Sequence, residues 1–415
     1  MSDSQRCSMQ TELLTRWRDQ LDEAVEIRGP ELVRVRRRLH SHPEPSGEEF
    51  ETTLFLFQSL KEAGFEPETT PDGRGLFVDL PELPGAPRIA IRADIDALRI
   101  QELRESDYRS QCAGVMHACG HDGHTAVVYG AFLALNDLRA SLPFPVNCRA
   151  IFQPAEETSR GAVEMISAGA LDGVDAILSI HMDPSRQVGR IGVRYGALTA
   201  ACDALEVTIC GRGGHAARPH ESLDPIAAAA QLISSIYLFI PRATDTQDPI
   251  VVTIGQVIAG HNPNVIPEQA ILRGTVRSLG GEVRERTKNH IRQLARGLAE
   301  VSGTQITVAF DPGPQSVYNA TELSDLLRDA ASEILGPAAV DLIQRPSMGG
   351  EDFAFYQEHV PGAMIRLGCA SPSAGGAPLH SASFDLDERA LSIGAKVLAR
   401  AAALWADPDR RSTNP

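Results

Sequence analysis

The alternation of strand-like and helix-like segments is the feature that most limits the folds open to this chain of 415 residues. Helical patterns and short β-branched runs follow one another in its first part, at residues 31–63, 88–93, 125–138, 146–152 and 176–180. Pro43 and Pro45 predict a break in the first helical stretch, because proline interrupts a helix. Strands separated by helices favour a largely parallel sheet with helices on both faces. We therefore predict an α/β fold with a mixed, mostly parallel sheet.

A second pattern begins near residue 201. A strand, a helix, two strands, a second helix and a last strand follow one another up to residue 311, in the order of the ferredoxin-like split unit. The earlier helix–strand alternation resumes after a stretch rich in proline and glycine. We predict a smaller α+β domain at 201–311, inserted into a larger α/β domain made of residues 1–200 and 312–415.

Composition excludes several classes of protein. Hydrophobic residues at 43% and charged residues at 22% are ordinary for a globular protein and argue against a disordered or fibrous chain. A formal net charge of −15 argues against nucleic acid and anionic lipid as partners. The basic run Arg36-Arg37-Arg38 is expected on a solvated helix face. The longest apolar run, at 226–240, is interrupted by polar side chains and is expected to be too short to span a bilayer.

The cysteines and the start of the chain indicate a compartment. Seven cysteines form neither a C-x-x-C pair nor a regular framework; they stand at positions 7, 112, 119, 148, 202, 210 and 369. In a chain of this size that pattern favours free thiols in a reducing environment. Residues 1–14 contain no apolar core followed by a small-residue cleavage site, so no signal peptide is predicted. We expect a cytoplasmic protein.

Residue types that bind metal ions gather in four places. Residues 116–124 contain three histidines, a cysteine and an aspartate, and the other places are Glu156-Glu157, His181 and His380. Asp94, the glutamate pair and His181 each follow a predicted parallel strand, and the carboxyl ends of such strands meet at one edge of a sheet. A thiolate, imidazoles and carboxylates suit zinc, manganese, cobalt or nickel better than calcium or magnesium. The sequence therefore predicts a site for such an ion at this edge.

Each of these residues also has a structural interpretation. A single buried histidine such as His181 is more often a hydrogen-bonding core residue, and Cys119 between small neighbours is typical of a buried apolar side chain. Glu156-Glu157 is also typical of a helix start. Their coincidence at strand ends favours the metal site. Two adjacent glutamates would let one bind metal while the other takes a proton from a metal-activated water.

Three polar residues of the smaller domain are candidates for substrate binding. His215 follows glycines at a strand-to-helix turn, Asn264 lies in the rigid turn NPNVIP, and Arg277 lies on the strand after it. Together they would bind a substrate carboxylate and polarise a carbonyl, since arginine pairs naturally with carboxylates. Interpretations as surface turns and a strand surface stay open for all three.

With these residues in hand, the chain resembles the M20 metallopeptidase family, and within it the amidohydrolase branch of aminoacylases, hippurate hydrolases and auxin-conjugate hydrolases. The resemblance covers roughly residues 31–400. It rests on the motifs RRRLHSHPEPSGEE, IRADIDAL, MHACGHDGHTA, IFQPAEE, IHMDP, GRGGHAARPH, NPNVIPEQAILRGTVRSL, MGGEDFAFY and PLHSASFDLDE.

The resemblance implies a binuclear metal site and a shared active site. It implies metal ligands at Cys119, His121, Glu157, His181 and His380, and Glu156 as general acid and base. Many wider-family members carry a ligand histidine where this chain has Arg92, so Asp94 is expected to orient a ligand rather than bind metal. The resemblance also implies that 201–311 is a lid that dimerises and sends His215 toward the partner subunit's active site to stabilise an oxyanion.

These observations lead to one expected activity and two alternatives. We expect a metal-dependent amidohydrolase that cleaves an N-acyl amino acid into a carboxylic acid and a free amino acid, with Asn264 and Arg277 binding the substrate. A dipeptidase or carboxypeptidase with the same two-metal site is the alternative among enzymes. A non-catalytic binder of metal or of an amino-acid conjugate is the alternative outside enzymes, although a binder would not need Glu156.

Overall fold

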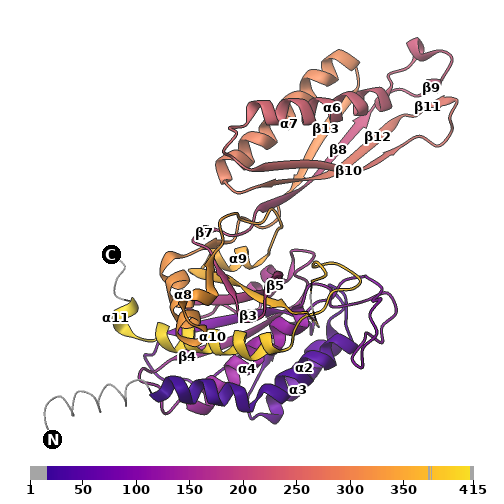
Figure 1. The fold of residues 1–415 in the computed structure, drawn as a ribbon. Helices are drawn as coiled ribbons and strands as arrows, with labels where there is room; N and C mark the ends of the chain where they lie inside the picture. Colours follow the sequence, from indigo (N-terminus) through magenta and orange to yellow (C-terminus); the bar gives the residue numbers. More distant parts are fainter. Residues whose placement is uncertain (1–15, 373, 375, 412–415) are drawn as a thin grey trace, which may run out of the picture. The chain divides into compact units, whose positions relative to one another are not determined.

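The computed structural model describes residues 16–372, 374 and 376–411, so Cys7 and the N-terminal segment of the signal-peptide prediction lie outside the described residues. The chain divides into two compact units. Of the described residues, the first unit contains those up to Gly196, the segment Tyr318–Arg345 and those from Phe355 onward. The second unit contains Ala197–Val317 and the short segment Pro346–Ala354. Figure 1 shows the elements of both units.

The first unit is built on an eight-stranded sheet with the order β1-β2-β4-β3-β5-β16-β6-β15. The strands are β1 (Glu68–Thr69), β2 (Leu76–Asp79), β3 (Arg88–Asp94), β4 (Asn147–Gln153), β5 (Ala176–Gln187), β6 (Ile191–Val193), β15 (Val340–Leu342) and β16 (Gly362–Ala370). Its central strands β4, β3, β5 and β16 run parallel, whereas β1, β2 and the β16–β6 pair add antiparallel pairings. The predicted mixed, mostly parallel sheet is confirmed. Its parallel centre brings the carboxyl ends of these strands to one edge.

Helices and shorter segments accompany this sheet. They are α2 (Gly29–Ser41), α3 (Phe50–Glu62), α4 (His121–Leu138), α5 (Gly161–Ser167), α8 (Thr321–Leu335), α9 (Phe353–Gln357), α10 (Arg389–Trp405) and α11 (Pro408–Arg411), with a 3-10 turn η2 (Pro337–Ala339) and a short β7 (Gly196–Ala197)–β14 (Tyr318–Asn319) pair. The gap between α2 and α3 contains Pro43 and Pro45, as predicted. Helices α2, α4 and α10 pack against one another on one face (Figure 1). Gly130 of α4 allows the close approach of α2, because a Cβ there would lie 2.5 Å from Leu32 Cδ2.

The prediction of a solvated face for the basic run is wrong at Arg36. Its side chain is fully buried and donates hydrogen bonds to Asp122 at 2.8 Å and to Asp385 at 2.6 Å. The face of α2 that carries Arg36 is covered by α4 and by the segment before α10, which the sequence pattern of α2 alone does not reveal. Two buried carboxylates offset the desolvation of the guanidinium. Arg37 does lie at the surface, paired with Glu388.

The second unit contains the predicted β-α-β-β-α-β order. Its elements are β8 (Ala201–Cys210), β9 (Gly214–His215), η1 (Pro219–Glu221), α6 (Pro225–Ala243), β10 (Ile250–Ala259), β11 (Val265–Ile266), β12 (Gln269–Ser278), α7 (Gly281–Ser302) and β13 (Gln305–Asp311). The antiparallel sheet has the order β10-β12-β8-β13, and α6 and α7 cover one face of it (Figure 1). Leu205, Val207, Leu232, Leu272 and Ile291 form part of a core separate from that of the first unit.

Helix α6 is longer than the apolar run that predicts it. It spans 19 residues, because Asp224 caps its start by accepting from Ile226 N and its end extends to Ala243. Among the described residues it is the one helix whose length and composition would suffice to cross a membrane, which corrects the prediction that the run is too short. Its buried side chains, among them Ala228, Leu232 and Ile236, belong to the core of the second unit.

Candidate metal centre

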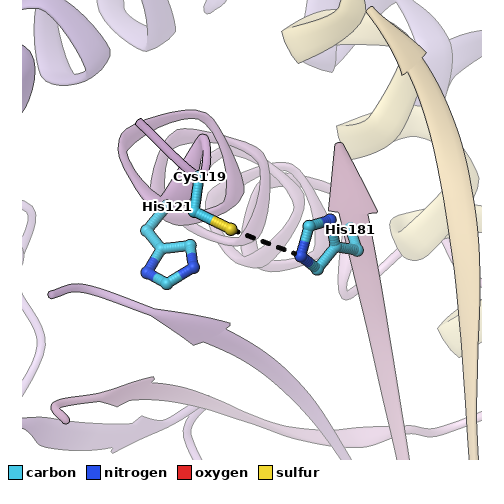
Figure 2. Close-up of side chains that lie close together, drawn as sticks. All are labelled: Cys119, His121 and His181. Atoms are coloured by element: carbon cyan, nitrogen blue, oxygen red, sulfur yellow. Dashed lines mark hydrogen bonds between the residues drawn. The ribbon is translucent and has the colours of Figure 1, made fainter. Parts of the chain in front are cut away.

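A left-handed glycine places two candidate ligands at the start of α4. Gly120 has φ of 83° and a Cβ there would lie 3.1 Å from Met182 Cβ, so no other residue fits this turn without strain. Helix α4 begins at His121, four residues earlier than the pattern predicts. Cys119 therefore comes directly before the turn and His121 stands on the first helical turn. Figure 2 shows both side chains beside His181.

His181 lies within β5 rather than after it, because the strand continues to Gln187. Its Nδ1 lies 2.8 Å from the carbonyl of Met182 and must donate the proton, since a carbonyl only accepts. Its Nε2 therefore has a free lone pair, and it lies 3.7 Å from Cys119 Sγ (Figure 2). Burial, followed by the charges of Arg366 and His124, holds the pKa of His181 well below its usual value. The ring is neutral, as a metal ligand must be.

Asp96 orients His121. The Nδ1 of His121 lies 2.9 Å from the carbonyl and 3.0 Å from Oδ1 of Asp96, so it carries the proton. The Nε2 of His121 is buried and has no hydrogen-bond partner among the described residues, although Asp94 and Glu156 oxygens lie 3.7 Å and 3.9 Å away. Burial alone would lower the pKa of His121, but Asp94 and Cys119 raise it well above the ordinary value. This position favours positive charge.

Glu156 and Glu157 stand on a tight turn after β4. Ala155 and Ser159 have φ of 51° and 55°, and both are outside the usual range for residues with side chains. The backbone N–H of Glu157 donates to Asp96 Oδ2 at 3.1 Å. Glu156 is buried with 8% of its surface exposed. Asp96 therefore contacts two candidate ligand segments at once.

His380 reaches the same place from the C-terminal part of the chain. Its backbone N–H donates to the carbonyl of Ala118 at 2.8 Å, which holds it beside Cys119. Its φ is 61°, another left-handed residue with a side chain. Its Nε2 lies 3.1 Å from Glu157 Oε1, an oxygen that accepts no hydrogen bond from the described residues. The Glu157 carboxylate raises the pKa of His380.

The five predicted ligands come together in two groups that share Cys119. One group is Cys119, His121 and His181, the other is Cys119, Glu157 and His380, and within each group one donor atom from every residue lies within 4.8 Å of the others. Glu156 joins His121 and Glu157 in a third group. Burial raises the pKa of the Cys119 thiol to about 12, so a neighbouring cation is needed to hold it as thiolate. The donor types fit divalent metal ions, and so does His121 Nε2, which is buried without a hydrogen-bond partner among the described residues.

Asp94 is engaged by its neighbours. Its Oδ1 lies 2.6 Å from His124 Nδ1, and Oδ2 accepts from Arg92 at 2.8 Å. Burial would raise its pKa, but His121, His124 and Arg92 hold it well below the ordinary value. His124 in turn accepts the backbone N–H of Met182 through Nε2 at 2.8 Å. Asp94 also shares a possible donor group with His121 and His124, so its expected orienting role stays a prediction.

Two contributors to this site escaped the sequence analysis. Asp96 lies two residues after Asp94 in IRADIDAL, and its position just past β3 was an available signal. His124 lies in the MHACGHDGH segment, but its contact with Asp94 requires α4 to begin at His121. Asp96 acts on the predicted ligands His121 and Glu157 through hydrogen bonds, whereas His124 contacts Asp94 and the backbone N–H of Met182.

The candidate residues of the second unit separate into two places. His215 pairs with Val265 in the β9–β11 ribbon, and Ala216 N donates to the carbonyl of Asn264 at 3.1 Å, so His215 and Asn264 are neighbours. Arg277 lies near the opposite end of β12, paired with Cys202, and its Nη1 donates to the carbonyl of Met348 at 3.0 Å. The ribbon adjoins the end of β12 that begins at Gln269. At about 3.4 Å per residue, Arg277 is about 27 Å farther along the strand.

Comparison with known proteins defines the class. A family model described as Peptidase family M20/M25/M40 matches residues 90–404. An N-acetylcysteine deacetylase from Bacillus subtilis is 42% identical over 374 residues, which cover 90% of this chain and 96% of the relative. Thermostable carboxypeptidase 2 from Saccharolobus solfataricus is 34% identical over 372 residues, covering 88% and 92%.

A solved structure of an M20 family protein also matches this chain. The Bacillus subtilis YXEP protein, described as a dinuclear metal-binding peptidase from the M20 family, superposes with a TM-score of 0.79 at 37% identity, covering 92% of this chain and 99% of that one. The chain belongs to the peptidase family M20/M25/M40, as its motifs predicted, and is a hydrolase.

Proposed function

We propose that this protein is a metal-dependent amidohydrolase that cleaves the amide bond of an N-acyl amino acid, releasing a carboxylic acid and a free amino acid. The observation that carries the proposal is the pair of donor groups sharing Cys119, with the buried carboxylate of Glu156 beside them. The deacetylase relative supports an acyl amino acid as the substrate class.

The proposed ligands are Cys119, His121, Glu157, His181 and His380. Two divalent ions, of manganese, zinc, cobalt or nickel, would polarise the substrate carbonyl and activate water when bound. Asp96 keeps the proton of His121 on Nδ1, and the Met182 carbonyl keeps that of His181 on Nδ1, so both Nε2 atoms can act as donors to metal. Asp94 is proposed to orient His124, which accepts the backbone N–H of Met182 next to His181, rather than to bind metal.

Glu156 is the proposed general acid and base. It takes a proton from the attacking water as the new C–O bond forms, and it delivers that proton to the leaving nitrogen as the C–N bond breaks. Its Oε2 lies 3.9 Å from His121 Nε2, which places it beside the proposed ligands. Replacing it with glutamine keeps the size of the side chain but removes the base.

His215 is proposed to stabilise the oxyanion. Its Nδ1 accepts the backbone N–H of Ala217 at 3.0 Å, so in the neutral ring the proton sits on Nε2. The exposed Nε2–H is then a hydrogen-bond donor for a developing negative charge. Asn264, held beside it by the β9–β11 ribbon, would help to bind the substrate.

We further propose that 201–311 acts as a lid and dimerisation domain and that two copies complete each active site. A small substrate cannot contact Arg277 and the His215–Asn264 pair of one copy, because about 27 Å of β12 separates them. If all three bind one substrate, Arg277 comes from one copy and His215 with Asn264 from the other. One Nη1 hydrogen bond to Met348 leaves the remaining guanidinium donors of Arg277 for a substrate carboxylate.

A dipeptidase or carboxypeptidase activity is the second candidate, supported by the carboxypeptidase relative. A reducing compartment such as the cytoplasm would keep the Cys119 thiol available, and the proposal includes that location. The partners proposed are a small-molecule substrate and a second copy of the chain, with neither nucleic acid nor membrane.

The test is a substrate panel on protein of known metal content. N-acetyl, N-benzoyl and N-fatty-acyl amino acids are assayed beside dipeptides, with wild type and Glu156→Gln compared. We expect turnover of an acyl amino acid by the wild type and loss of turnover with unchanged metal content in the variant. Faster turnover of dipeptides would select the second candidate, and full activity of Glu156→Gln would reject the assigned base. Binding of metal and conjugate without any turnover would favour the non-catalytic binder.

The shared site is tested by complementation. His215→Ala and Glu156→Gln subunits are each expected to be inactive alone. Mixed heterodimers should regain part of the activity, because one of the two sites then has both residues intact. Absence of recovery in verified heterodimers would contradict the shared site.

A further inference from the structure

Glu49 is a buried carboxylate that the proposed mechanism does not use. It lies at the start of α3, within the segment HPEPSGEE, and its side chain is fully buried. Its Oε1 accepts two backbone hydrogen bonds, from Gly47 N at 2.9 Å and from Ala155 N at 2.8 Å. The second bond reaches across 106 residues to the residue just before Glu156. Glu49 therefore connects the start of α3 to the turn of the proposed general base.

Ala155 has a backbone conformation that an alanine does not adopt readily. Its φ of 51° lies in the left-handed region, where the Cβ crowds the following carbonyl. Its carbonyl accepts from Arg160 N and Gly161 N, both at 3.2 Å, so the turn after it is closed on itself. The backbone N–H of Ala155 has Glu49 as its acceptor. Among the described residues, this hydrogen bond is the contact through which the α3 side holds Ala155 in this conformation.

The direction of Glu156 and Glu157 follows from this turn. Asp96 fixes the turn from one side through Glu157 N, at 3.1 Å. Glu49 fixes the turn from the other side through the backbone N–H of Ala155, which is two residues before Glu157. A relaxed φ at Ala155 would rotate the chain that enters Glu156, whereas the Asp96 contact holds only the residue after it.

We propose that Glu49 is a positioning residue that holds Ala155 in the left-handed conformation and thereby aims the carboxylates of Glu156 and Glu157 at the metal centre. The expected effect on turnover rests on the proposed function. The expected effect on metal binding rests only on the position of Glu157 at the metal centre. The acceptor oxygen, not the negative charge, carries the role. Burial raises the pKa of Glu49 to about 7, so a large share of the side chains carry a proton at neutral pH, and glutamine keeps the same acceptor oxygen.

The experiment separates conformation from general stability. Glu49→Gln keeps an acceptor oxygen, Glu49→Ala removes it, and Glu49→Ala/Ala155→Gly removes it but gives position 155 a residue that adopts a positive φ without strain. Glu48→Ala is the matched control, because that neighbouring glutamate is exposed and pairs with Arg99 at the surface. Each variant is measured for kcat and KM, for affinity of the apo protein for Zn²⁺ against a competing chelator, and for Tm.

We expect Glu49→Ala to lower kcat and Zn²⁺ affinity about tenfold or more, with KM little changed. Glu49→Gln should keep both within about threefold of wild type, and Ala155→Gly should restore most of the loss in the Glu49→Ala background. If a folded Glu49→Ala/Ala155→Gly variant does not regain kcat and Zn²⁺ affinity, the proposal is overturned. It is also overturned if Glu49→Ala has the kcat and the Zn²⁺ affinity of the wild type.

Two further measurements cover a Glu49→Ala variant that does not fold and a wild type without activity. If Glu49→Ala does not fold, Ala155→Val tests the same turn without touching Glu49, because a β-branched residue disfavours a positive φ. Wild-type Zn²⁺ affinity in a folded Ala155→Val variant would overturn the proposal. If the wild type hydrolyses no acyl amino acid or peptide, the proposed function fails, and the Zn²⁺ affinities still decide the role of Glu49.

Discussion

Replacing Asp96 with asparagine removes a negative charge and one acceptor oxygen from the middle of the site. Asp96 accepts from His121 Nδ1 at 3.0 Å and from Ser46 Oγ at 2.6 Å, and its Oδ2 also accepts from Glu157 N at 3.1 Å. An asparagine NH₂ group would face a donor whichever oxygen it replaces. Losing one hydrogen bond to a charged acceptor costs about 1.5–3 kcal/mol. Loss of such an orienting partner lowers metal affinity about 10–100-fold, which corresponds to a similar energy.

The assay is a titration of the apo protein with Zn²⁺ against a chelator of known affinity. Asp96→Asn should bind Zn²⁺ about 10–100-fold more weakly than the wild type. Asp137→Asn is the control, because Asp137 lies on α4, the helix that carries His121, but pairs with Arg28 at the surface, and it should bind Zn²⁺ as the wild type does. Asp96→Asn with an affinity within about twofold of the wild type would refute the assignment of His121 and Glu157 as ligands held by Asp96.

Three other outcomes follow from buried groups. Burial raises the pKa of Glu49 from 4.5 to about 7, so the folded state binds this proton more tightly and the free energy of unfolding should fall as pH rises from about 4.5 to 7. Urea denaturation should show that the decrease between pH 5 and pH 8 is up to about 3 kcal/mol smaller in Glu49→Gln than in the wild type. An equal decrease in both proteins would contradict this prediction. Arg36→Met should cost about 3–5 kcal/mol by leaving Asp122 and Asp385 without their partner, against less than about 1 kcal/mol for Arg37→Met; equal losses would contradict the buried ion pairs. Removing metal with a chelator should lower Tm, and Cys119→Ala should reduce the difference between the Tm values with and without chelator. An unchanged Tm in the presence of the chelator would count against ligands that bind metal only in the folded state.

The sequence alone was enough to predict the framework and the main ligand types. Local periodicity and the break at Pro43 and Pro45 predict α2, α3 and the strands β3, β4 and β5, because helical and extended segments bury side chains at different spacings. The order of segments from residue 201 predicts the separate antiparallel sheet of the second unit. Cys119 and His181 could be singled out because their chemistry is rare and they stand near strand ends.

The tertiary structure decided which of several similar side chains take part. Glu49 and Arg36 look in the sequence like the solvated charges beside them, Glu48 and Arg37, and only packing against the turn after β4 and against α4 buries them. The antiparallel register of β12 sets Arg277 far from His215, a separation that no local pattern contains. Burial and distance depend on residues that are remote in the chain, whereas periodicity depends on neighbours. For that reason the elements follow from the sequence, while the partners of each charge follow from the fold.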